Sequence, residues 1–246
     1  AACEPEITNL AEMLIAMGAR ITGAGTSRLV VEGVRELHPV TFSVIPDRIE
    51  AGTLMIASAI TRGDVTLENC DPDVMLALFV KFSEMRVPFE RLDARTVRVN
   101  CPHRAKSADV TTLPYPGFAT DLQSPLMALL CVSEGYALVE EKIYPERFMH
   151  VPEYRRLGAE IRKQFNTCIV TGVDKLQGAP VAATDLRAGA GLILLGLVAE
   201  GETEVLKISH VDRGYENFHG KLAALGAQIR RVDYSPMRRA SDRRAA

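Results

Sequence analysis

Thr184-Asp185-Leu186-Arg187 has counterparts at Thr120-Asp121-Leu122-Gln123 and at Pro46-Asp47-Arg48, and these repeated stretches are the strongest indication of the fold. In each copy the aspartate opens an apolar block, a glycine ends the block, and a short β-type run follows. The copies recur at intervals of roughly 70 residues, which indicates one supersecondary unit used three times. The apolar blocks are 54–60, 126–132 and 192–199, and the glycines are Gly63, Gly135 and Gly201.

Each copy predicts a helix, a strand, a second helix and a pair of strands. The block after Asp47 is apolar and rich in small residues, as expected for a helix buried on most sides. Asp71-Pro72-Asp73 predicts the start of the second helix, because aspartate favours the cap and proline an early helical position. We therefore expect an α/β fold of repeated βαβαββ units. In the first copy the predicted elements are helix 50–61, strand 65–67, a helix from 71 to about 85, and a hairpin of 89–92 with 96–100.

The first residues of the chain contain only the second half of such a unit. Met17-Gly18-Ala19-Arg20-Ile21 matches the junctions at 157–161 and 225–229, where a second helix leads into a strand, but only the helix 4–17 precedes it. We therefore expect a fragment or a split product of a two-domain protein. The expected divisions are 1–38 as a partial remnant of the first domain, 42–233 as the second domain with three units, and 234–246 as a disordered tail.

Composition argues against several classes of protein. The formal net charge is −2 and charges of both signs are spread along the chain, so no nucleic-acid-binding face is expected. The longest apolar run, 192–199, is far shorter than the roughly 20 residues that span a bilayer, and no signal-peptide pattern opens the chain. Five scattered cysteines without a CxxC pair favour reduced thiols in a cytoplasmic compartment. We expect no membrane contact, no metal and no cofactor.

Six motifs are spread along nearly the whole length of the chain: ACEPEI (2–7), VIPDRIE (44–50), PGFATDLQ (116–123), RFMHVPE (147–153), ATDLRAG (183–189) and HVDRGYE (210–216). Together, and in this order, they resemble the enolpyruvyl transferases, most closely the members that act on UDP-N-acetylglucosamine. The resemblance implies an inside-out α/β barrel with two domains of three units each. This chain resembles about the C-terminal half of such an enzyme.

The resemblance implies transfer of the enolpyruvyl group of phosphoenolpyruvate to a sugar hydroxyl of UDP-N-acetylglucosamine, with release of phosphate. That is the first committed step of peptidoglycan synthesis, a cytoplasmic process on which cell shape and cell division depend. The implied partners are these two substrates and the missing N-terminal half. Two alternatives stay open. The first is an enolpyruvyl-shikimate-phosphate synthase or an RNA-terminal-phosphate cyclase, although the motif segments at 45–50 and 147–152 argue against both. The second is a catalytically inactive remnant or binding module of the same fold.

Asp121 is the candidate catalytic base, because the resemblance matches it to the family aspartate that contacts the sugar hydroxyl. An ordinary carboxylate is a weak base near neutral pH, so close placement and desolvation would be needed. From spacing alone, the alternative is that Asp121 only caps the helix beginning at Leu122, a role also open to Asp47 and Asp185.

Cations are needed for the phosphate and carboxylate of phosphoenolpyruvate, and the resemblance implies Arg187 and Arg213. A guanidinium binds either anion in a bidentate way that lysine cannot reproduce. Without the resemblance, each would be a surface or ion-paired arginine. The resemblance also implies Arg147 and Arg48, each as an anion contact or as an interdomain salt bridge. Ile143 would contact the nucleotide sugar through its backbone, unless it is an ordinary strand residue.

The resemblance places one further group outside this chain. The family's acid for the methylene carbon, a cysteine or aspartate on a mobile loop, lies in the missing half together with a lysine–asparagine pair and a loop arginine. None of the cysteines here matches that loop. We therefore expect this chain alone to have a base and anion-binding arginines but no methylene acid.

Overall fold

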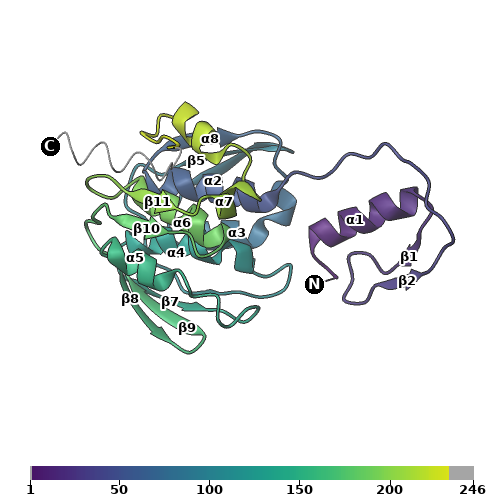
Figure 1. Cartoon of the computed structure of the whole chain (residues 1–246), viewed down its shortest axis with the longest axis horizontal. Helices are drawn as coiled ribbons and strands as arrows, with labels where there is room; N and C mark the ends of the chain where they lie inside the picture. Colours follow the sequence, from purple (N-terminus) through teal and green to yellow (C-terminus); the bar gives the residue numbers. More distant parts are fainter. Residues whose placement is uncertain (1, 233–246) are drawn as a thin grey trace, which may run out of the picture.

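The computed structural model describes residues 2–232, and three buried helices form the centre of its larger part (Figure 1). They are α2 (Arg48–Ile60), α4 (Gln123–Cys131) and α6 (Leu186–Gly196), one from each repeated unit, and they contact one another. Every residue of α4 is buried, and α2 and α6 are buried along most of their length. Small and apolar side chains permit burial on nearly all sides, and the helix predicted after each aspartate is confirmed.

The strands of this larger part form three sheets outside the central helices (Figure 1). In the first two units, the strand after the central helix pairs antiparallel with the second strand of a hairpin, so that Val65 lies opposite Val99 and Val139 opposite Cys168. The first sheet has the order β3 (Asp64–Leu67), β5 (Thr96–Asn100), β4 (Phe89–Asp93). The second has the order β6 (Val110–Thr111), β7 (Tyr136–Glu140), β9 (Thr167–Thr171), β8 (Glu160–Gln164). The third pairs β10 (Pro180–Ala182) with β11 (Glu204–Leu206) in parallel.

The second helix of the first unit is broken, and the prediction of one continuous helix was wrong. Asp71 does act as a cap, accepting a hydrogen bond from the backbone N of Asp73 at 3.1 Å, but the element that begins there is a 3-10 turn, η1 (Pro72–Val74). Met75, with φ −115° and ψ 12°, departs from helical geometry before α3 (Leu76–Glu84) begins. The later short helices are α5 (Val151–Arg156), α7 (Ser209–Asp212) and α8 (Phe218–Ala224).

Within the described residues, which end at 232, the third unit shows no strand pair after the junction 225–229, where the sequence predicted one. Residues 227–232 are irregular, and no strand follows β11 within the part of the chain that the structure describes. β11 is only three residues long and pairs with β10. In the first two units a hairpin strand pairs with the corresponding strand, but no described residue takes that place beside β11. The tail expected at 234–246, and the domain end expected at 233, lie outside the described residues.

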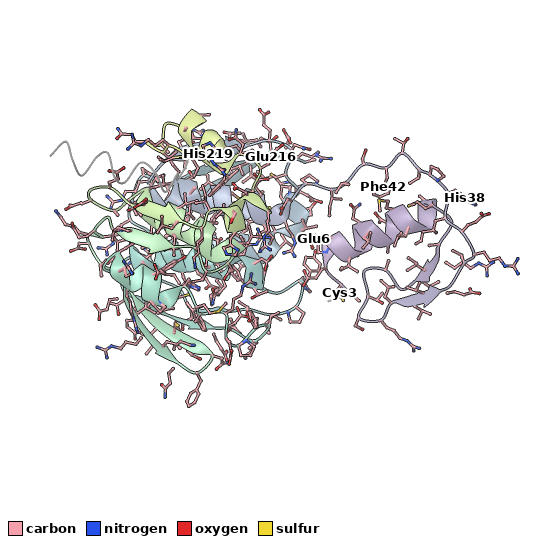
Figure 2. All side chains as sticks on the ribbon, in the orientation of Figure 1. Cys3, Glu6, His38, Phe42, Glu216 and His219 are labelled. Carbon is pink, nitrogen blue, oxygen red and sulfur yellow. The ribbon has the colours of Figure 1, made fainter. Side chains whose placement is uncertain are left out.

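Residues 2–38 form a separate smaller part, joined to the larger one by an extended segment (Figures 1 and 2). This part contains α1 (Pro5–Ala16) and the antiparallel pair β1 (Arg20–Thr22) and β2 (Val30–Glu32). Of the residues 2–38, only Asn9 and Ala11 are buried. The large apolar side chains exposed here are Ile7, Leu10, Ile15, Val30, Val31, Val34 and Leu37.

The cysteines are free thiols, and four of the five are buried. Burial raises the pKa of Cys168 to about 12 and also raises the pKa of Cys131, which lies in α4. These two thiols are therefore protonated core residues rather than nucleophiles. No helix among residues 2–232 combines the length and the apolar character needed to cross a membrane.

His150 is a buried titratable group just before α5. It is 1% exposed, and its ring stands edge-on to Tyr154 with centroids 4.7 Å apart. Its Nε2 atom is buried and has no hydrogen-bond partner among the described protein atoms. Burial lowers the pKa of His150 from 6.5 to about 4, so the ring is neutral at physiological pH.

His150 should make folding stability depend on pH in a defined window. The folded state binds its proton less tightly than the unfolded state, so stability falls as the pH falls from about 6.5 to about 4. We expect a loss on the order of 2–3 kcal/mol from this group, measured by urea unfolding across that range. His150→Phe should remove this component, since a phenyl ring suits the apolar site and cannot be protonated. An unchanged pH slope in the variant would contradict the assignment.

Candidate active site

The three repeated aspartates play two different roles. The Oδ1 atom of Asp47 accepts hydrogen bonds from the backbone N of Ile49 at 2.7 Å and of Glu50 at 3.1 Å, which caps α2. Asp185 caps α6 in the same way, accepting from Arg187 N at 2.8 Å and Ala188 N at 2.9 Å. These bonds satisfy backbone donors that a helix start leaves open.

Asp121 does not cap a helix, and the cap alternative for it was wrong. It lies within a 3-10 turn, η2 (Thr120–Leu122), and neither η2 nor α4 has a side-chain cap. Its Oδ2 accepts from Arg187 Nη2 at 2.9 Å and Nε at 3.1 Å, and its Oδ1 accepts from Arg147 Nη1 at 2.7 Å. The Asp121 side chain is still 37% exposed, so part of it is accessible to solvent.

The two arginines decide the charge state of Asp121. Partial burial of the carboxyl acts to raise its pKa, but the positive charges of Arg187 and Arg147 outweigh burial and hold the pKa below 3.8. Asp121 is therefore ionised at neutral pH. Its contribution to stability is present above pH 3.8 and is lost as the pH falls through the lower, folded-state pKa.

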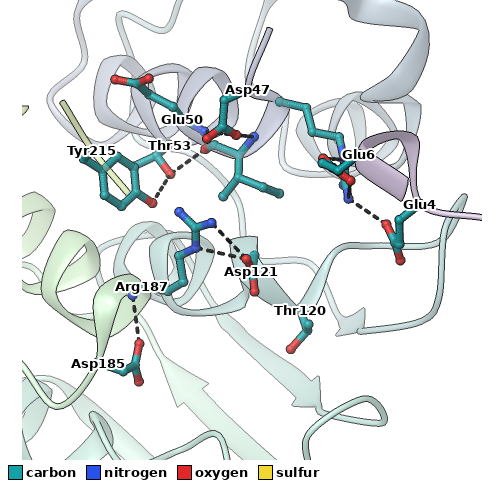
Figure 3. Close-up of polar contacts among 12 residues, drawn as sticks. Glu4, Glu6, Asp47, Glu50, Thr53, Thr120, Asp121, Asp185, Arg187 and Tyr215 are labelled. Carbon is teal, nitrogen blue, oxygen red and sulfur yellow. Dashed lines mark hydrogen bonds and ion pairs between the residues drawn. The ribbon is translucent and has the colours of Figure 1, made fainter. Parts of the chain in front are cut away.

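Arg187 connects Asp121 to the other two units. Figure 3 shows its guanidinium between the Asp121 carboxylate and the ring of Tyr215, with Cζ 5.2 Å from the ring centroid. The Tyr215 hydroxyl shares a hydrogen bond of 3.0 Å with Thr53 Oγ1, and Thr53 donates to Ile49 O at 2.8 Å. The Nη1 atom of Arg187 is buried, and the Arg187 guanidinium interacts with Tyr215 as well as with Asp121. The cluster thus joins α2, η2, α6 and the segment after α7.

Comparison with known proteins gives the family. The sequence model described as EPSP synthase (3-phosphoshikimate 1-carboxyvinyltransferase) matches residues 1–222, most of this chain. The chain belongs to the EPSP synthase family. Within this family it is similar to proteins named UDP-N-acetylglucosamine 1-carboxyvinyltransferase, with 49% identity over 232 residues to that of Desulfosudis oleivorans and 52% over 233 residues to that of Xylella fastidiosa. Each match covers 94% of this chain and 55% of the relative, so the chain spans about half the length of these curated relatives.

Solved structures show the EPSP synthase family fold as well. The enolpyruvyl transferase NikO from Streptomyces tendae superposes with a TM-score of 0.80 at 29% identity, over 92% of this chain and 54% of that chain. EPSP synthase from Acinetobacter baumannii has a TM-score of 0.67 at 16% identity, over 91% of this chain and 55% of its own, which is evidence for the fold alone. The predicted inside-out α/β architecture is therefore confirmed.

The other arginines predicted for the site differ in their partners in the structure. Arg48 donates to Glu4 Oε2 at 2.7 Å and Glu6 Oε1 at 2.8 Å, so the salt-bridge alternative holds for it and joins the two parts of the chain. Arg147 pairs with Asp121 inside the larger part instead of bridging the parts. Arg213 is exposed at the end of α7 and forms no hydrogen bond or ion pair with another residue of the described chain.

Ile143 lies in the loop after β7, and the alternative that it is a strand residue was wrong. Its backbone N donates to Glu141 Oε1 at 2.8 Å, and its side chain points partly into solvent. Sequence reasoning missed Glu141, Thr53 and Tyr215. Tyr215 lies in the same motif as Arg213, which gave a signal for it, but the spacing of Thr53 gave none. The described residues contain no cluster of three or more histidine, cysteine or acidic side chains placed to hold a metal ion.

Proposed function

We propose that this chain forms one half of the active site of an enolpyruvyl transferase, which moves the enolpyruvyl group of phosphoenolpyruvate onto a sugar hydroxyl of UDP-N-acetylglucosamine. One observation carries the proposal: the Asp121 carboxylate lies between two arginines where the three units meet. The chain that holds this site is about 50% identical in sequence to relatives named UDP-N-acetylglucosamine 1-carboxyvinyltransferase. The proposed setting is cytoplasmic peptidoglycan synthesis, and through it cell shape and cell division.

In this proposal Asp121 takes the proton of the sugar hydroxyl, whose oxygen bonds to the phosphate-bearing carbon of phosphoenolpyruvate. The electrons of the carbon–carbon double bond take a proton at the methylene carbon, from an acid in the part of the enzyme that this chain does not cover. The carbon–oxygen bond to phosphate then breaks, phosphate leaves with that electron pair, and loss of a methyl proton restores the double bond. Arginines that hold both anions keep the reacting atoms in place.

Arg187 is proposed to couple phosphoenolpyruvate binding to the basicity of Asp121. Its Nε and Nη2 atoms hold Asp121, and about a tenth of its side chain is exposed. A carboxylate or phosphate bound beside Arg187 would share its positive charge with Asp121. Because that charge holds the pKa of Asp121 low, sharing it raises the pKa toward the range in which a carboxylate accepts a proton.

The choice of acceptor substrate tests the function. The assay uses a joined protein, in which this chain is linked to the part of the Xylella fastidiosa relative that it does not match. We expect phosphate release from phosphoenolpyruvate with UDP-N-acetylglucosamine and none with shikimate 3-phosphate; the reverse would favour the EPSP synthase alternative. The chain alone is expected to release no phosphate with either acceptor. A joined protein that folds but is inactive with both would favour the inactive binding module.

Arg213 is proposed to contact phosphoenolpyruvate when the two halves close, since it is exposed and unpaired among the described residues. Arg213→Lys in the joined protein should raise KM for phosphoenolpyruvate about 10-fold, because one ammonium replaces a planar fork. KM for the nucleotide sugar should change far less. The matched control is Arg162→Lys on the exposed edge strand β8. Equal kinetics for the two variants would remove Arg213 from the site.

Residues 1–38 are proposed to be part of a first domain, and 42–233 to be a second domain. The exposed apolar side chains of α1 and β2 support this division, because an isolated domain rarely leaves so many apolar side chains uncovered. In hydrogen exchange, amides of α1 should lose protection well before those of α6. Protection of α1 should rise in the joined protein. Equal protection of α1 and α6 in the chain alone would contradict the division.

A further inference from the structure

Glu141 is a fully buried carboxylate directly after β7, with 0% of the residue exposed. Its Oε1 atom accepts three hydrogen bonds, from Thr112 Oγ1 at 2.6 Å, Ile143 N at 2.8 Å and Tyr144 N at 2.9 Å. Its Oε2 atom accepts one, from Thr120 Oγ1 at 2.9 Å. All four donors are neutral groups. A buried side chain that accepts four hydrogen bonds through both of its oxygens is held in one position.

The donors of Glu141 belong to two different parts of the candidate site. Thr120 also accepts a hydrogen bond from Arg147 Nη1 at 3.0 Å, and the same nitrogen donates to Asp121. The Oε2 atom of Glu141 is therefore linked through Thr120 to Arg147, which holds Asp121. The other oxygen fixes the loop that carries Ile143, the proposed contact for the nucleotide sugar.

Thr112 holds Glu141 from the side of the sheet. Thr112 is fully buried, follows β6, and accepts a hydrogen bond from Lys142 N at 3.0 Å while it donates to Glu141. Together these bonds place the loop 141–144 relative to the end of the sheet. The neighbouring Glu140 is different, since it faces Thr111 Oγ1 at 3.3 Å and forms a half-exposed ion pair with Lys142 Nζ at 3.1 Å.

We propose that Glu141 is a positioning residue whose single carboxylate acts on two groups. It positions Asp121 through Thr120 and Arg147, and it positions the loop that carries Ile143 directly. This inference rests on the proposed transferase function. A carboxylate serves because both oxygens only accept hydrogen bonds. An amide can keep the three bonds at Oε1, but it presents an N–H group to Thr120.

Glu141→Gln in the joined protein should therefore disturb only the hydrogen bonds that lead through Thr120 and Arg147 to Asp121. The Thr120 hydroxyl has to turn and accept from the new amide as well as from Arg147. We expect kcat to fall about 10-fold while KM for UDP-N-acetylglucosamine changes little, because small misplacements of a reacting group are costly. Glu141→Ala should also raise KM, since the loop amides lose their acceptor. Glu140→Gln is the matched control and should leave both parameters within about 2-fold.

A double-mutant cycle separates positioning from general damage to the fold. If Glu141 acts through Asp121, Glu141→Gln should cost little further turnover in an Asp121→Asn background. The inference is overturned if the two losses multiply, if Glu141→Gln has normal kcat, or if Glu140→Gln loses as much.

An inactive wild-type joined protein would contradict the proposed function, and the contacts of Glu141 are then judged in the 246-residue chain. Amide exchange at Ile143 and Tyr144 should become faster in Glu141→Ala but not in Glu140→Ala. Unchanged exchange in Glu141→Ala would overturn the inference.

Discussion

Asp121→Asn should lower turnover of the joined protein by about 10²–10⁴-fold, the usual effect of losing a general base. The amide has nearly the shape of the carboxylate but cannot take the proton of the sugar hydroxyl. Its one oxygen still accepts from Arg187 or Arg147, so the binding site should stay assembled. We therefore expect a large fall in kcat, whereas the Kd for UDP-N-acetylglucosamine, measured by calorimetry, should stay within a small factor of its value in the unsubstituted joined protein.

Asp47→Asn is the matched control for this substitution. Asp47 occupies the corresponding place in the first unit, but its carboxylate caps α2. Asparagine caps helices nearly as well as aspartate, so turnover should change little. Near-normal turnover in Asp121→Asn, or an equal loss in Asp47→Asn, would contradict the assignment of Asp121 as the base.

Gly191→Ala should cause a large loss of folding stability, although it adds only one methyl group. Gly191 lies in α6 where it meets α4, and a Cβ atom there would be 1.8 Å from Tyr154 Oη and 2.8 Å from Ser124 Oγ. Tyr154 is fully buried, and its hydroxyl bonds to Ser124 Oγ at 2.8 Å and donates to Ser124 O at 2.9 Å. The methyl group has to displace this hydroxyl and break both bonds.

The expected cost of Gly191→Ala is roughly 2–4 kcal/mol, the sum of overpacking and lost buried hydrogen bonds. Urea unfolding at neutral pH measures it. Gly33→Ala is the control, because a Cβ atom at Gly33 meets nothing within 4 Å. A change below about 1 kcal/mol in Gly191→Ala would mean that α4 and α6 pack less tightly than their contact indicates.

The central helices could be predicted from sequence because their cause is local. An aspartate cap followed by small apolar residues specifies a buried helix wherever it occurs, and α2 and α6 begin directly after Asp47 and Asp185. The break at Met75 could not be read in this way, since apolar residues continue through it. Among the described residues no strand follows Ile229, and a strand there would depend on pairing with residues far along the chain, which no local pattern encodes.

The site shows the same division between local and long-range causes. Three aspartates in similar local sequences look alike, yet Asp121 does not cap its helix, because Arg147 and Arg187 reach it from other elements. Those arginines were predicted as ligands for substrate anions, and their pairing with Asp121 was not. Glu141 was missed because its role appears only when Thr112 after β6, Thr120 in η2 and the loop after β7 come together.

The most direct test of this account is the titration of the Asp121 carboxyl by carbon-13 NMR in the 246-residue chain itself. Asp121 is an ionised carboxylate held between two arginines at the meeting point of three units, and it does not cap a helix. We therefore expect a pKa below 3.8 that rises when Arg187 is replaced by leucine. A pKa at or above 3.8, or one that does not respond to Arg187→Leu, would contradict it.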